Sequence, residues 1–117
     1  MKINTIRENH LFTRTYKKGK TSVQKPLVVY FLKDSRRSTG LRVGLTVNKK
    51  LGGAVERNRV RRILREAFRT IVLAYPELQQ SGGLMIIVAR SAAFGSQVKT
   101  QDMTVALKRA LENLGLV

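Results

Sequence analysis

A long amphipathic helix, predicted to follow two glycines and to stop before a proline, constrains this 117-residue chain more than any other feature. Gly52 and Gly53 break the pattern that precedes it. Pro76 ends it, because the residue before a proline avoids helical dihedral angles. Between them apolar side chains recur with a period of 3.6 residues, at Val60, Ile63, Leu64, Ala67, Phe68, Ile71 and Tyr75. This helix can therefore bury one side in a core and leave the other open.

Arginines gather on one flank of the same helix. At 100° per residue, four of them fall within an arc of about 100° beside the apolar stripe. These are Arg61, Arg62, Arg65 and Arg69. Arg57 lies at the head of the arc and Arg59 on the far side. Planar, permanently charged guanidinium groups suit phosphate, and Asn58 can reach a base edge or a sugar hydroxyl.

The total charge also points to a polyanion. The chain has 23 Lys and Arg against 7 Asp and Glu, a net charge of +16, and residues 1–75 carry +15 of it. One cluster comprises Arg14, Lys17, Lys18, Lys20 and Lys25, and the other comprises Lys49, Lys50 and the arginines at 57–69. Bound phosphates would relieve the repulsion within each cluster. A nucleic acid is favoured over a merely solvated face, and over an anionic membrane, because neither cluster lies on a helix with a wide exposed apolar face.

Composition excludes several classes of protein. A hydrophobic content of 43% is that of a folded chain and not of a disordered basic tail. No apolar run approaches the ~20 residues of a membrane span, and the N-terminus has no apolar signal region. Without cysteine, no disulfide or Cys-based zinc site can form. We expect one cytoplasmic domain spanning residues 1–117.

The remaining pattern predicts an α+β fold. Asn9 is expected to cap a short helix that ends near Lys18, with Gly19 in the left-handed conformation. Residues 27–32 read as a buried strand, and a turn at 34–40 suits a hairpin into a strand at 41–48 whose odd-numbered positions face a core. Residues 84–90 form the best candidate for a central strand. Thr100 is expected to cap a last helix that stops at Gly115.

A catalytic site of the protein's own is not predicted. His10 is the only histidine and is expected at the surface. Asp34, Glu56, Glu66 and Asp102 have no spacing that builds a two-metal carboxylate site. No phosphate-binding G-x-x-x-x-G-K-[ST] loop is present.

Three segments resemble the protein component of bacterial ribonuclease P. Residues 57–69, RNRVRRILREAFR, are similar to the RNR signature of that family. Residues 12–19, FTRTYKKG, resemble its first helix, and residues 41–52, LRVGLTVNKKLG, resemble the strand and turn before the RNR helix. Two departures are mild: Arg61 stands where many relatives have Lys, and Gly53, a poorer helix cap, stands where some have Asn.

The resemblance implies a fold and a function. The fold would be a single-domain α/β sandwich of order αβββαβα, with a four-stranded sheet and a left-handed βαβ crossover (ribosomal protein S5 domain 2-like). It adds a short strand near residues 20–23. In the family, a catalytic RNA removes the 5′ leader of precursor tRNA using Mg²⁺, and the protein binds both RNAs. No membrane and no obligate protein partner are expected.

The resemblance also implies site residues. The candidate contacts to the catalytic RNA are Arg57, Asn58, Arg59, Arg61, Arg62, Arg65, Arg69, Lys49 and Lys50. The candidate leader cleft consists of Phe12, Tyr16 and Tyr30, with Arg14, Lys17, Lys18 and Arg42 as phosphate contacts. Spacing alone would favour placing Phe12 and Tyr16 in a core. The alternative function is that of a ribosomal or other structured-RNA-binding protein.

Overall fold

Four strands form one mixed sheet in the spatial order β1-β2-β4-β3. The computed structural model describes residues 4–33, 40–80 and 82–117. Along the chain the elements are α1 (Asn9–Lys18), β1 (Lys20–Val23), β2 (Leu27–Lys33), β3 (Leu41–Thr46), α2 (Ala54–Ala74), β4 (Gly83–Ala89) and α3 (Thr100–Asn113), with 3₁₀ turns at Lys49–Leu51, Pro76–Gln80 and Ser91–Phe94. The predicted order αβββαβα is confirmed, including the short strand that only the resemblance implied.

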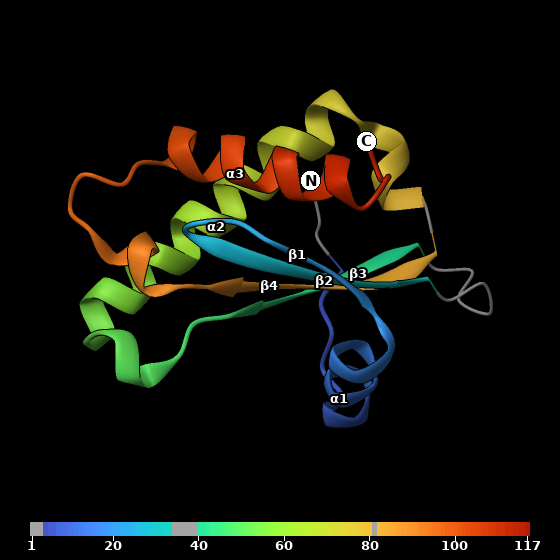
Figure 1. Cartoon of the computed structure of the whole chain (residues 1–117), viewed down its shortest axis with the longest axis horizontal. Coiled ribbons are helices and arrows are strands. Elements are labelled where there is room, and N and C mark those ends of the chain that lie inside the picture. The colour runs from blue at the N-terminus through green and yellow to red at the C-terminus, as the bar shows by residue number, and fades with distance from the viewer. Residues whose placement is uncertain (1–3, 34–39, 81) are drawn as a thin grey trace.

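The strand pairing differs from the predicted hairpin. β2 pairs with β1 and β4, both antiparallel, while β3 pairs in parallel with β4. The hairpin between the strands at 27–32 and 41–48 is therefore wrong, and most of its predicted turn, residues 34–39, lies outside the described residues. β4 is the most apolar strand, with both faces buried from Gly83 to Ile87. Because helices cover both faces of the sheet (Figure 1), a central position buries both faces of β4, and this favours a crossover through α2 over a local hairpin.

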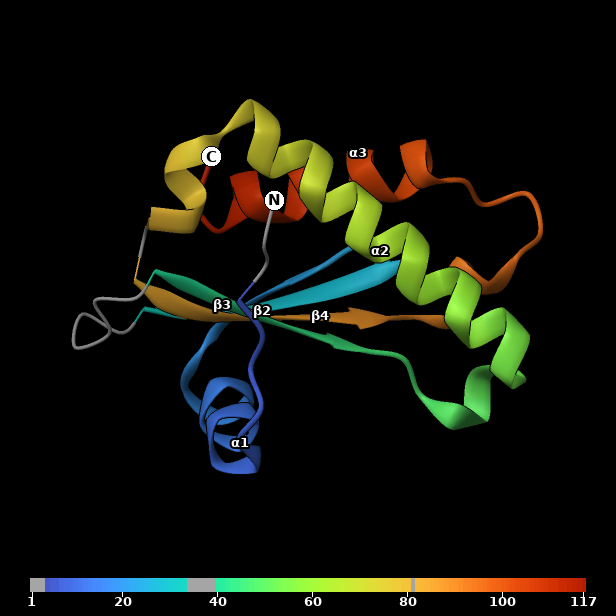
Figure 2. The ribbon, with the colours of Figure 1, turned by 180° about the vertical axis from the view of Figure 1, so that it is seen from behind.

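Helices cover the two faces of the sheet unequally. α2 and α3 lie together on one face, and α1 alone lies on the other (Figures 1 and 2). The face under α2 and α3, here called the closed face, holds most of the core, including the fully buried Phe68, Met85 and Leu107. The face under α1, here called the α1 face, has a small separate core of Ile6, Leu11, Leu84 and Ile86. Ten residues of helix cannot cover a whole four-stranded face.

The ends of α1 correct two predictions. Asn9 is the first residue of the helix and not its cap; Glu8 occupies the cap position with extended dihedral angles. Gly19 is also extended, with φ −75°, and not left-handed. A Cβ at Gly19 would lie 2.5 Å from the carbonyl oxygen of Thr15. Glycine is needed there because the chain turns closely past the helix end into β1.

The cap position of the last helix is occupied by Lys99 and not by Thr100. Lys99 precedes the helix, and its backbone N–H donates to Asp102 at 2.8 Å. Thr100 is already the first helical residue, so its predicted capping role is wrong. The predicted stop is confirmed: Gly115 adopts φ +75°, and its N–H donates to the carbonyl of Glu112.

Candidate nucleic-acid interface

The arginine row of α2, defined as Arg57, Arg61, Arg62, Arg65 and Arg69, lies beside the buried stripe of the helix. Val60, Ile63, Leu64, Ala67, Phe68, Ile71 and Val72 are buried against the sheet and α3. Arg62, Arg65 and Arg69 are exposed, whereas Arg57 and Arg61 are half-buried. The helix therefore holds one side in the core and presents guanidinium groups on its flank, as the periodicity predicts.

Arg59 has a different environment from the row. Its guanidinium donates to the carbonyl of Val98 at 2.5 Å and to those of Gly95 and Ser96 at 3.4 and 3.5 Å. These bonds tie the first turns of α2 to the loop before α3. Arg59 is among the predicted RNA contacts, but its donors already serve the protein's own backbone. The sequence does indicate this difference, because helical periodicity places Arg59 on the far side of the helix from the row.

The start of α2 continues the basic surface. Lys49 and Lys50 are exposed on the 3₁₀ turn before the helix, and the Asn48 side chain accepts from the Lys50 N–H at 2.9 Å. Asn58 is also exposed. At the helix start itself, Glu56 accepts from the backbone N–H of Gly53 at 3.3 Å, although Gly53 has no side chain to cap the helix in return.

An aromatic surface, consisting of Phe12, Tyr16 and Tyr30, lies between α1 and the α1 face. The rings of Tyr16 and Tyr30 meet edge to face with centroids 4.8 Å apart, and those of Phe12 and Tyr16 lie 6.5 Å apart. The Tyr16 hydroxyl lies 3.4 Å from that of Thr46. Phe12 and Tyr30 are half-buried, while Tyr16 is 39% exposed. Phe12 and Tyr16 share one face of α1, as their spacing predicts.

A row of small side chains continues this surface beyond α1. Strand register aligns Val23, Val28, Val88 and Thr46 across all four strands on the α1 face. Val23 is 60% exposed and the other three are only half-buried. The sequence gives no sign of this row, because the pairing of β2 with β4 brings together residues about sixty positions apart. It extends the aromatic surface with partly exposed, mostly apolar side chains.

Gly44 sets the height of α1 above the sheet. A Cβ at Gly44 would lie 2.7 Å from Cε1 of Phe12. The ring therefore rests directly on the strand backbone, which brings α1 close enough for Tyr16 to reach Thr46. In the sequence the glycine occupies a solvent-side position of an alternating strand, and nothing there shows what lies over it.

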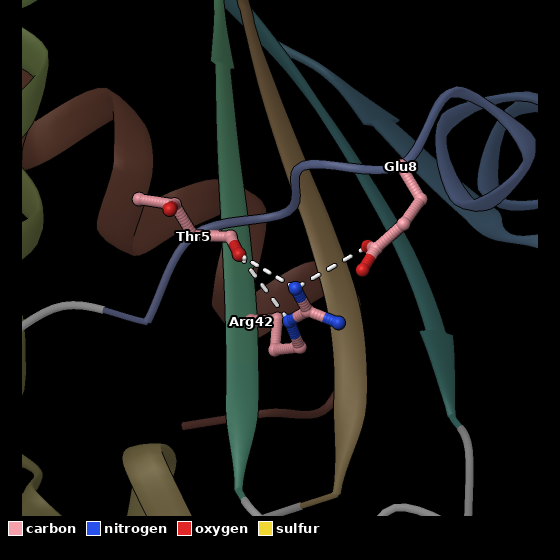
Figure 3. Close-up of polar contacts among 3 residues, drawn as sticks. All are labelled: Thr5, Glu8 and Arg42. Atoms are coloured by element: carbon pink, nitrogen blue, oxygen red, sulfur yellow. Dashed lines mark hydrogen bonds and ion pairs between the residues drawn. The ribbon is translucent and has the colours of Figure 1, made fainter.

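Arg42 holds the N-terminal segment against the edge strand β3. Its Nε and one terminal nitrogen donate to the carbonyl of Thr5 at 3.2 and 3.0 Å, and the same nitrogen lies 3.3 Å from a carboxylate oxygen of Glu8 (Figure 3). Backbone bonds between Val43 and the residues on either side of Thr5 run along the same edge. Arg42 is a predicted contact to leader phosphates, but the structure commits its guanidinium to holding the segment that leads into α1.

The other predicted phosphate contacts lie along α1. Lys17 and Lys18 are exposed in its last turn, and Arg14 is half-buried. His10 is exposed, as expected. Within residues 4–33, 40–80 and 82–117, no three His, Asp or Glu side chains gather as a metal ion would require. No helix among these residues is long and apolar enough to cross a membrane.

Comparison with known proteins identifies the family. A family model described as Ribonuclease P matches residues 1–115. A ribonuclease P protein component from Clostridium acetobutylicum is 36% identical over 117 residues, covering 100% of this chain and 93% of the relative. One from Clostridioides difficile is 36% identical over 100 residues, covering 86% of this chain and 83% of the relative.

Comparison with solved structures indicates the same family. The structure of a Staphylococcus aureus RNase P protein superimposes with a TM-score of 0.79 at 30% identity, covering 98% of both chains. That of an RNase P protein from Thermotoga maritima gives 0.72 at 26% identity, covering 91% of this chain and 93% of the other. Sequence and fold point the same way, and the chain belongs to the ribonuclease P protein family.

Proposed function

We propose that this chain is the protein subunit of ribonuclease P, which binds a catalytic RNA and the 5′ leader of precursor tRNA and promotes removal of the leader. The observation that supports this most is the presence of two unlike surfaces on elements that cover opposite faces of one sheet: the arginine row on α2 and the aromatic surface beside α1. A structured RNA and a single strand are recognised by such different means.

The arginine row is assigned to the catalytic RNA. Its exposed members carry positive charge on a rigid helix, and Lys49 and Lys50 extend that charge toward the helix start. Each arginine that neutralises a phosphate releases condensed counterions, so binding should weaken steeply as salt rises. Arg59 is assigned to the protein's own loop and not to RNA, because three carbonyls already accept from it.

The aromatic surface is assigned to the leader. Leaders differ in sequence from one tRNA to the next, and stacking on an aromatic ring accepts any base at about 1–3 kcal/mol per base. Tyr16 is exposed enough to offer part of its ring, and the half-buried Val28, Val88 and Thr46 continue the surface beside it. Lys17 and Lys18, at the end of α1, are placed to meet the phosphates of the same strand.

The chemistry is assigned to the RNA subunit. Leader removal is proposed to depend on Mg²⁺, but the described carboxylates do not gather into a site that would hold the ion. The carboxylates of the described residues do not form a Mg²⁺ site of the protein's own, so the ion is placed on the RNA. The protein's part is to neutralise phosphates and to hold the leader in an extended form.

Reconstitution tests the proposal directly. The chain is mixed with a bacterial ribonuclease P RNA, and 5′ maturation of precursor tRNA is measured at low Mg²⁺, where the RNA alone is slow. We expect the chain to stimulate cleavage at the mature 5′ end. An absence of stimulation, together with copurification of ribosomal RNA from cells, would favour the alternative of a ribosomal or other structured-RNA-binding protein.

A control with the protein alone addresses cleavage without the RNA subunit. A Staphylococcus aureus RNase P protein mutant of known structure is described as having defective mRNA degradation activity. An unstructured mRNA therefore belongs beside precursor tRNA among the substrates. We expect no cleavage of either by the chain on its own; metal-dependent cleavage that copurifies with the folded protein would contradict the assignment of chemistry to the RNA.

Charge reversal separates the two surfaces. Arg62→Glu and Arg65→Glu should weaken binding to the catalytic RNA and lower its salt dependence. Lys108→Glu on α3, which is also exposed, serves as the matched control. If all three variants lose the same affinity at every salt concentration, the effect is one of net charge and the arginine row has no special role.

Removal of the rings tests the leader assignment. The double variant Phe12→Ala, Tyr16→Ala should lose affinity for precursor tRNA with a leader, while its affinity for mature tRNA in the holoenzyme stays unchanged. Removing the stacking of one base should reduce the preference for the precursor by about fivefold or more. Equal losses for both RNAs would remove the leader from this surface.

A further inference from the structure

A hollow of about 420 Å³ opens at the edge of the sheet where α1 ends and β1 begins. Three lysines from three elements converge on it: Lys18 from α1, Lys20 from β1 and Lys33 from β2. The rest of its lining is apolar apart from backbone, and comprises Phe31, Leu32, Leu114, Gly115 and Leu116. This hollow is here called the lysine pocket.

Most of the lining of the lysine pocket lies on the closed-face side of the sheet, although Lys18 ends α1 and Leu32 packs against the core of the α1 face. Lys20 pairs with Phe31 across β1 and β2, and Phe31 belongs to the core of the closed face. Side chains two apart on a strand share a face, so Lys33 lies on that side as well. The α3 end, with Leu114 and Leu116, closes the hollow from above. The pocket therefore lies at the edge of the sheet, and none of Phe12, Tyr16 and Tyr30 lines it.

No carboxylate among the described residues lines the lysine pocket, and none of its three lysines forms an ion pair with an acidic side chain of residues 4–33, 40–80 and 82–117. An exposed lysine often needs no partner, and Lys20 also protects the edge strand β1 from pairing with another sheet. That role does not account for Lys18 and Lys33, which come from other elements yet surround the same hollow. Like charges repel, so an anion bound among these three lysines would be attracted by all of them and would relieve their repulsion.

We propose that the lysine pocket binds a phosphate group of an RNA strand, with the attached sugar and base covering its apolar floor. The volume suits one nucleotide, since small-ligand sites occupy about 300–1,000 Å³. Lysine suits this role because its ammonium is a compact charge on a flexible stem that can adjust to a phosphate. The proposal extends the proposed function by a third RNA contact, and it rests on that function only for the class of ligand.

Two RNAs could supply that phosphate, namely the catalytic RNA and the distal part of the leader, and both share the same chemistry. Lys18 directly follows Lys17 at the end of α1, where the leader surface stops, so a strand leaving Tyr16 can pass round the edge of the sheet to reach the pocket. The experiment therefore measures binding to each RNA separately.

The test compares two double variants of the full-length chain. Lys20→Ala, Lys33→Ala removes two charges from the pocket, and Lys99→Ala, Lys108→Ala removes two charges that do not line it. Binding of each variant to ribonuclease P RNA, and of each holoenzyme to precursor tRNA with short and long leaders, is measured over a salt series. Unfolding in urea confirms that both variants are folded, and Lys20→Arg, Lys33→Arg serves as a charge-preserving variant.

For each phosphate that the pocket variant no longer neutralises, we expect the affinity advantage of the unmodified chain over that variant to shrink by about threefold between about 50 and about 200 mM salt. The control should show a smaller change, and the arginine variant should bind like the unmodified chain. An effect with the RNA subunit assigns the phosphate to that RNA; an effect only with long leaders assigns it to the leader.

Equal behaviour of the pocket and control variants with every RNA would overturn the proposal. That result is distinguishable from a failure of the proposed function, because stimulation of leader cleavage by the unmodified chain is measured independently of these variants.

Discussion

The two faces of the sheet are formed by the same strands but are buried to different extents. On the closed face, α2 and α3 bury alternate residues such as Val29, Met85 and Ile87 completely. On the α1 face, the ten-residue α1 covers Leu84 and Ile86 but leaves Val28, Val88 and Thr46 half-buried. The difference teaches that stability and recognition are divided between the faces: one is fully packed, and the other retains apolar surface for a ligand.

Matched aromatic truncations test this division and should give the largest effect. Phe68→Ala on the closed face removes a side chain that is 1% exposed and should cost about 3–5 kcal/mol of the free energy of unfolding. Tyr16→Ala on the α1 face should cost about 1 kcal/mol or less, because the ring is already partly in water. Urea denaturation measures both. Similar costs would show that the α1 face is as tightly packed as the closed one.

Gly44→Ala should have the next largest effect. The new methyl group would meet the Phe12 ring, so α1 must shift away from the sheet, at about 1–3 kcal/mol. Leader preference should fall as well, because Tyr16 moves with the helix. Gly95→Ala is the control, since its Cβ would meet only Val98 at 3.6 Å. An unchanged free energy of unfolding in Gly44→Ala would mean that Phe12 is free to move aside.

Arg42→Ala and Arg62→Ala should behave in opposite ways. Arg42 holds Thr5 and Glu8, so its loss should lower the free energy of unfolding by about 1–2 kcal/mol. Arg62 is exposed, so its loss should change stability by about 0.5 kcal/mol or less, while it lowers the salt slope of catalytic-RNA binding by about 0.9. Denaturation and salt-series binding are measured on both variants. If Arg42→Ala left the free energy of unfolding unchanged but reduced the salt slope of RNA binding, Arg42 would again be assigned to phosphate contact.

The smallest expected effect concerns the start of α2. Gly53 occupies the cap position with φ −73°, and a Cβ there would approach no atom closer than Glu56 Oε1 at 3.9 Å. Gly53→Asn should therefore raise the free energy of unfolding by a few tenths of a kcal/mol, roughly the advantage of Asn over Gly at a helix cap. Denaturation should show this gain with RNA binding unchanged. A loss of stability would show that Asn cannot adopt the required geometry.

Local patterns predicted the elements better than their ends or their partners. The stripe from Val60 to Ile71 predicted α2, and the apolar run at 84–90 predicted the central strand, because period and burial are written in neighbouring residues. The caps at Asn9 and Thr100 were misassigned, since Glu8 and Lys99 take the extended conformation instead. The predicted hairpin was wrong because the order of the strands depends on which strand is stabilised most by a central position in the sheet.

For the candidate site, too, the sequence predicts local positions but not long-range partners. The positions of Phe12 and Tyr16 on one helical face, and of Arg62, Arg65 and Arg69 on another, follow from spacing. The roles of Arg42 and Arg59 do not follow from spacing, because the carbonyls that accept from them lie 36 to 39 positions away in the sequence. A guanidinium in a basic cluster looks the same in sequence whether a carbonyl or a phosphate accepts from it.

The sequence by itself determined the helices, the central strand, the excess of positive charge in residues 1–75 and the family to which the chain belongs. These depend on periodicity, composition and motif, which are local. Only the tertiary structure decided which face stays open, which arginines the fold uses for itself, and that Lys18, Lys20 and Lys33 surround one hollow. Each of these depends on strand order and on the reach of α1, and therefore on contacts between residues that are distant in the chain.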